Sequence, residues 1–140
     1  MSSPRVNIEH IFAAPREQVF AFFAVHENLE TIFVPARIRR IRDGSDSPDG
    51  LGSVRRMKLP LIPAFEETIT ALEPNSRIEY RITRGTPLNH HLGILRFTDT
   101  PSGTRLHYTI ELESAIPGVA AAVGFGLTQG IKRGLSKLKF

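Results

Sequence analysis

The chain has 140 residues, of which 41% are hydrophobic, a length and composition that suit a globular domain and exclude a disordered protein. It contains no cysteine, which excludes disulfide bonds and thiolate chemistry and suits a reducing cytoplasm. The first residues lack the apolar core of a signal peptide, and no apolar run approaches the roughly 20 residues of a membrane span. We therefore expect one domain over residues 1–140, in a cytoplasmic protein with no integral membrane segment.

The net charge of +4 has one main location. Four cations without any neighbouring acid lie near the end of the chain: Lys132, Arg133, Lys137 and Lys139. Cations at the C-terminal end of a helix complement its dipole, so we favour helix stabilisation over an anionic-lipid or nucleic-acid patch. No nucleic-acid partner is expected. A second basic group, within residues 37–42 and 55–58, is explained by a solvated strand face.

In chain order, the pattern predicts strands broken by two short helices and closed by a long one. Alternating apolar residues predict a strand over 6–12, and Pro15 with Glu17 predicts the start of a short helix. A weaker helical segment follows over 27–33. Turn residues then separate six further predicted strands, over 36–42, 53–59, 65–72, 77–83, 89–98 and 104–113. Pro117 and Gly118 open a helix of about 22 residues.

These elements predict an α+β fold, a curved antiparallel sheet of about seven strands that holds the long C-terminal helix against one face. Only that helix is long enough to cover the sheet. The last strand indicates the inner face by placing four apolar side chains on one side: Leu106, Tyr108, Ile110 and Leu112. The helix presents a matching apolar stripe of Leu127, Ile131, Leu135 and Leu138.

The long helix also carries small residues at four-residue spacing: Ala122, Gly126, Gly130 and Gly134. Each glycine in a helix costs about 0.8–1 kcal/mol relative to alanine, so the row needs a compensation. One interpretation is room for a ligand or for close approach of the sheet. The alternative is a loose helix, or a packed contact without any void.

The alternation of side chains along the strands predicts that a charged residue points into the interior of the protein. If Phe65 and Ile69 point inward, so do Glu67 and Ala71, and a buried carboxylate is costly unless it is paired. Arg55, on the neighbouring strand, is the expected partner. The arrangement fits either a small-molecule cavity or a structural ion pair at the rim of the sheet. The candidate ligand-binding residues are Arg55, Met57, Phe65, Glu67, Tyr80, His91, Tyr108, Gly126 and Gly130.

Several segments together resemble the SRPBCC or START-like superfamily, which includes a polyketide cyclase/dehydrase and lipid-transport group, birch-pollen allergens and plant abscisic-acid receptors. They are GLGSVRRMKLP, FEETITALEPNSRIEYRI, HHLGILRFTD, SGTRLHYTIELE and the terminal GLSKLK. The resemblance implies a helix-grip fold with a deep cavity between sheet and helix. It also matches Arg55 and Glu67 to an arginine and an inward glutamate of the family. The receptors' gating loop and its lysine are not evident, so hormone sensing is not implied.

Three functions follow as hypotheses. The first is a non-catalytic binder of a small hydrophobic molecule that is lipid-, quinone- or polyketide-like. The second is a cyclase/dehydratase-type enzyme in which Glu67 works with His91, Tyr80 or Tyr108 as acid or base. The third is a protein- or membrane-interaction module that uses the basic helix end. Whether any reaction is catalysed, and the oligomeric state, stay open.

No metal or cofactor is expected. His90 and His91 are adjacent in a predicted strand, so they point to opposite faces and cannot ligate one ion together. The other three histidines add no close ligand spacing, and cysteine ligands are absent.

Overall fold

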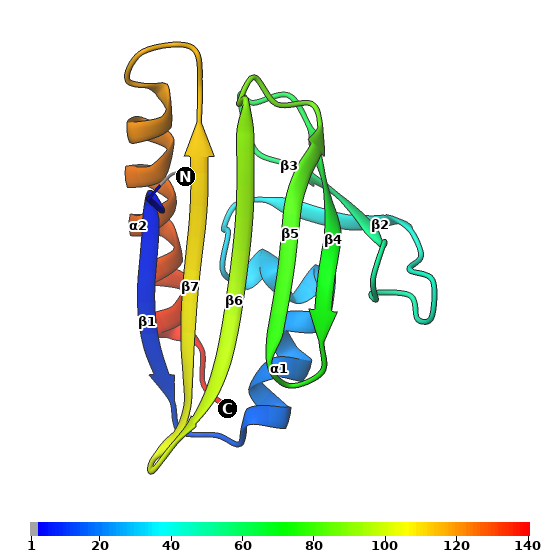
Figure 1. Cartoon of the computed structure of the whole chain (residues 1–140), viewed down its shortest axis with the longest axis vertical. Helices are drawn as coiled ribbons and strands as arrows, with labels where there is room; N and C mark the ends of the chain where they lie inside the picture. The colour runs from blue at the N-terminus through cyan, green and yellow to red at the C-terminus, as the bar shows by residue number, and fades with distance from the viewer. Residues whose placement is uncertain (1–2) are drawn as a thin grey trace.

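The protein, described by a computed structural model over residues 3–140, is an open seven-stranded antiparallel sheet with helices on one face (Figure 1). The strands lie in the order β1-β7-β6-β5-β4-β3-β2, so the chain meanders from β2 to β7 and β1 pairs with the last strand. The strands are β1 (Val6–Phe12), β2 (Arg37–Arg42), β3 (Val54–Lys58), β4 (Phe65–Glu73), β5 (Arg77–Arg84), β6 (His90–Thr100) and β7 (Gly103–Glu113). The helices are α1 (Arg16–Ala24), the 3₁₀ helix η1 (His26–Thr31) and α2 (Val119–Lys137). The predicted α+β fold is confirmed.

All three helical segments lie behind the sheet in Figure 1, and the face toward the viewer is uncovered. α2 packs along β1 and β7, and its stripe is buried at Ile131 and Leu135. It has 19 residues, fewer than expected, because Gly118 before it takes a φ of 84° and Leu138 after it is extended. No helix among residues 3–140 is both long and apolar enough to cross a membrane.

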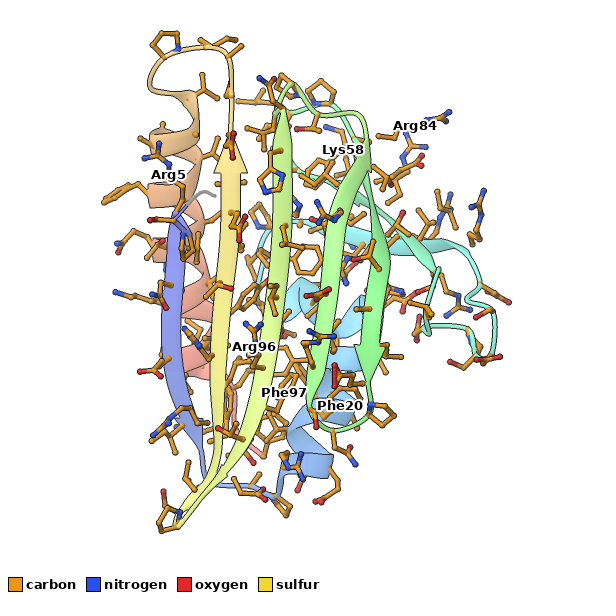
Figure 2. All side chains as sticks on the ribbon, viewed as in Figure 1. Arg5, Phe20, Lys58, Arg84, Arg96 and Phe97 are labelled. Atoms are coloured by element: carbon orange, nitrogen blue, oxygen red, sulfur yellow. The ribbon has the colours of Figure 1, made fainter. Side chains whose placement is uncertain are left out.

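Aromatic side chains pack α1 against the covered face of the sheet, at β6. Phe20 and Phe23 of α1 pack on Phe97 of β6, with ring centroids 5.4 and 5.8 Å apart. Figure 2 shows Phe20 and Phe97 side by side in the lower half of the molecule. Aromatic contacts at these spacings favour packing beyond the area they bury, so they fix α1 against the sheet.

The inner face follows the predicted alternation along most of the sheet, with one exception in β4. The pairing of β4 with β5 shifts between Ile69 and Ala71, so that Ala71 lies opposite Glu79 and Leu72 opposite the buried Ile78. A bulge inserts one residue and reverses which side chains face inward beyond it. The expectation that Ala71 points inward was therefore wrong, and Leu72 packs against the core instead.

Candidate functional site: a buried polar cluster on the inner face of the sheet

Arg55 and Glu67 form an ion pair enclosed within the protein. They are direct partners in the β3–β4 register, and Arg55 Nε donates a hydrogen bond of 2.8 Å to Glu67 Oε1. Their exposed fractions are only 3% and 6%. The pair thus lies inside the protein rather than at the solvated rim of the sheet. Inside the protein, each charge depends on the other for its stability.

Arg55 also organises two neighbours from other elements. Its terminal Nη1 donates to His26 Nδ1 at 3.2 Å, and its guanidinium carbon lies 4.6 Å from the centre of the Tyr80 ring. A cation over an aromatic face is attracted by the ring, more strongly when water is excluded. The arginine is therefore held by a carboxylate, an imidazole and a ring at once.

His26 is a member of the cluster that sequence reasoning missed. It comes from η1, and its Nε2 lies 2.8 Å from the Oγ of the fully buried Ser53. Because Nδ1 accepts from Arg55, the imidazole proton sits on Nε2 and is donated to Ser53. Burial, reinforced by the charge of Arg55, lowers the pKa of His26 to about 4. Strand parity cannot place a side chain that arrives from a short helix, so no sequence signal pointed to it.

Tyr80 and Tyr108 meet at the centre of the cluster. Their hydroxyls are hydrogen-bonded to each other, and both rings are buried. Burial raises the pKa of each phenol above its usual range, so both stay protonated at neutral pH. Gly93, opposite Tyr80 in the β5–β6 register, leaves the space that the Tyr80 ring occupies. A glycine inside a strand is the sequence signal for such a close approach.

His91 has one ring nitrogen engaged and one available. Its Nδ1 accepts a hydrogen bond of 3.0 Å from the backbone N–H of Ile82, and burial lowers the pKa of its imidazole. The ring is therefore neutral, with its proton on Nε2. Among residues 3–140 the structure records no hydrogen bond at that Nε2. His91 thus offers one N–H donor at the inner face.

The remaining candidates divide into buried and exposed residues. Met57 is buried beside Arg55, and its register partner Phe65 is partly buried. Gly126 and Gly130 lie on the exposed side of α2, with open space where a β-carbon would be. The structure therefore does not bring these two glycines to the polar cluster.

The glycine row does not form one surface. Residues four apart in a helix are rotated by about 40° from each other, so a row of four spreads around the axis. At its end, a β-carbon on Gly134 would lie 2.7 Å from the backbone of Ile32. Gly134 thus serves a close contact with the segment after η1, whereas Gly126 and Gly130 face open space.

Two surface concavities lie apart from the cluster. One, of about 500 Å³, is formed where α1 meets the β4–β5 turn, beside Arg16, Arg77 and Arg96. The other, of about 310 Å³, lies next to the connection between β7 and α2. Neither is lined by Arg55, Glu67 or His91. Among residues 3–140, no group of three or more metal-ligating side chains could hold an ion.

The fold described above also occurs in a known protein family. A model described as polyketide cyclase / dehydrase and lipid transport matches residues 3–139. The chain belongs to this family. No curated protein matches the chain. Membership of the polyketide cyclase/dehydrase and lipid-transport family thus identifies the fold and names no specific ligand.

Solved structures share the fold at low sequence identity. The Aha1 dimer from Colwellia psychrerythraea is 12% identical with a TM-score of 0.72, and the match covers 96% of each chain. A Thermus thermophilus protein is 20% identical with a TM-score of 0.68, covering 94% of this chain and 91% of that one. A Mycobacterium smegmatis protein is 19% identical with a TM-score of 0.65, covering 93% and 85%. At these identities the likeness extends to the fold alone.

The low pKa of His26 makes stability depend on pH. The folded protein holds this imidazole neutral, with a pKa of about 4 against 6.5 in a model peptide, so acid favours the unfolded chain. We expect the contribution of His26 to be complete above about pH 6.5 and to be lost as the pH falls toward 4, with a slope of at most about 1.4 kcal/mol per pH unit. Urea denaturation across this range measures it.

The variant His26→Gln should flatten that slope, whatever its effect at neutral pH. The matched control is His107→Gln, because His107 lies on the outer face and bonds Asn7. A slope in His26→Gln equal to that of the unaltered protein would show that the buried imidazole is not its source.

Proposed function

We propose that this chain binds a small hydrophobic molecule on the inner face of the sheet, and that the molecule carries a hydrogen-bond acceptor such as a carbonyl oxygen. The observation that carries the proposal is the Nε2–H of His91, which is oriented by the Ile82 backbone and has no recorded protein partner among the described residues. Because no protein acceptor occupies this N–H, an acceptor atom of a ligand can receive its hydrogen bond. Family membership supports a ligand of lipid or polyketide chemistry.

The hydrogen bonds of the cluster and the protonation of its tyrosines favour ligand binding over acid–base catalysis. Glu67 is engaged by Arg55, both tyrosines remain protonated, and His91 has its Nδ1 occupied by a backbone donor. An effective general base needs an available lone pair near a reacting proton. His91 therefore presents a hydrogen-bond donor to a ligand, and Glu67 acts by positioning Arg55.

Apolar surface for the rest of the ligand adjoins the core. His91 lies opposite Leu112, and its ring centre is 5.4 Å from that of Tyr80. Partly buried hydrophobic side chains of the surrounding strands, loops and α2 pack against the same core: Phe65, Leu88, Val123 and Leu127. Small-molecule sites combine such apolar walls with a few oriented polar groups.

Titration with three probes tests the proposal: decanoic acid, the naphthoquinone menadione and the anthraquinone emodin, followed by NMR and native mass spectrometry. We expect saturable binding of at least one carbonyl-bearing probe. His91→Leu should weaken it about tenfold, as the loss of one hydrogen bond of about 1.4 kcal/mol would.

The matched control is His90→Leu. His90 is the adjacent residue, and it faces the other side of the sheet, where it bonds Glu111. Binding should be unchanged in this variant. Failure of all three probes to give a saturable shift, or equal losses in the two variants, would contradict the proposal.

A further inference from the structure

The connection between β3 and β4 displays two large apolar side chains in water. Leu61 is 102% exposed and Ile62 is 49% exposed, and we call this pair the apolar tip. Single exposed apolar residues are common, but two in succession, one of them without any covering atoms, form a feature that water disfavours. Figure 1 shows the β3–β4 and β5–β6 connections together at the upper end of the sheet.

The loop that carries the apolar tip is held in place. Lys58 Nζ donates hydrogen bonds of 2.6 Å to the carbonyl oxygens of both Leu59 and Ile62. Leu61 has a φ of 67°, a conformation that costs energy for a branched side chain. Local strain that the surrounding contacts maintain is typical of functional loops. The tip is therefore a fixed projection.

Exposed cations lie on β3, which leads into the apolar tip, and on the neighbouring strand β2. Arg37 lies directly opposite Lys58, and Arg39 directly opposite Arg56, in the β2–β3 register. Like charges in directly opposite positions destabilise a sheet, so these pairs need a compensation. The structure records no ion pair for Arg37, Arg39 or Arg56 among residues 3–140.

A further cation reaches the same end from β5. Arg84 lies opposite Glu66, and the next residue, Gly85, abuts the backbone of Ala64 and Phe65 at the end of the tip loop. In Figure 2, Lys58 and Arg84 both lie in the upper part of the molecule. We call the five residues Arg37, Arg39, Arg56, Lys58 and Arg84 the basic collar. One acid, Glu66, lies between two collar residues: it is opposite Arg56 on β3 and opposite Arg84 on β5.

We propose that this end of the protein docks on an anionic lipid bilayer, with the apolar tip in the interface and the basic collar on lipid phosphates. Apolar side chains gain free energy on entering the boundary between headgroups and acyl chains, and nearby cations are attracted to a negatively charged leaflet. A nucleic acid would use the collar but would give Leu61 little apolar environment, whereas a bilayer offers an apolar layer directly beneath its anionic surface. The proposal stands apart from ligand binding, since empty vesicles test it without any ligand.

The chain contains no tryptophan, so one introduced tryptophan reports on its own surroundings. In Leu61→Trp, we expect the fluorescence to shift to the blue with vesicles that contain phosphatidylserine as about a quarter of the lipid in phosphatidylcholine. The control is Ile11→Trp, because Ile11 is 52% exposed on β1 at the opposite edge of the sheet. No shift is expected there, nor for either variant with phosphatidylcholine alone.

Co-sedimentation with the same vesicles separates the tip from the collar. Leu61→Ser/Ile62→Ser should lower the affinity at least tenfold, whereas Ile11→Ser should leave it unchanged. Arg56→Gln/Arg84→Gln should also weaken binding and reduce its dependence on salt. Absence of the fluorescence shift, equal binding to neutral vesicles, or full binding without the tip would overturn the proposal; the last result would identify a purely electrostatic surface.

Discussion

Replacing Arg55 with methionine should lower the free energy of unfolding by about 3–5 kcal/mol, because the Glu67 carboxylate is then left unpaired inside the protein. The substitution removes three interactions that Arg55 makes in this structure. Glu67 Oε1 loses its donor at 2.8 Å, His26 Nδ1 loses the donor that orients it, and the Tyr80 ring loses its cation. Urea denaturation at neutral pH measures the difference.

Two variants make this expectation specific to the buried pair. Arg56→Met alters the next residue, which is exposed on the outer face, and should change stability by less than about 0.5 kcal/mol. Arg55→Met/Glu67→Leu removes both charges and should recover much of the loss, since an apolar pair carries no desolvation penalty. A double variant as unstable as Arg55→Met would show that the unpaired carboxylate is not the cause.

Gly93→Ala should also be strongly destabilising, by about 3 kcal/mol at the upper end of the usual cost of overpacking. A β-carbon at residue 93 would lie 2.3 Å from Cζ of Tyr80 and 2.7 Å from its hydroxyl oxygen. The ring cannot move aside freely, because Arg55 lies over its face and Tyr108 holds its hydroxyl. Thermal and urea denaturation should both report the loss.

The control for this substitution is Gly126→Ala on α2. Nothing lies within 4 Å of the added β-carbon there, so the helix preference of alanine should raise the stability by about 0.8–1 kcal/mol. The same chemical change is thus expected to have opposite signs at the two glycines. Equal effects, or a stable Gly93→Ala variant, would show that the Tyr80 ring is less constrained than these contacts imply.

The fold and most of the cluster could be predicted because their determinants are local. Alternation of side chains along a strand has a fixed period of two, so Glu67 and Arg55 could be assigned to the inner face from neighbouring apolar residues. The same reasoning failed at Ala71, where a bulge in β4 adds a residue. A bulge is set by pairing with the next strand, which alternation within one strand does not reveal.

Sequence by itself determined the sheet, the covering helix and the inward direction of Arg55 and Glu67, because hydrophobic periodicity and turn residues act over short distances. Tertiary structure alone decided that His26 joins them from η1, that His91 Nδ1 meets the Ile82 backbone, and that Gly126 and Gly130 face open space. Each of these depends on how separate elements pack. Spacing along the chain does not encode such contacts, since they are set by the position and rotation of whole helices and strands relative to one another.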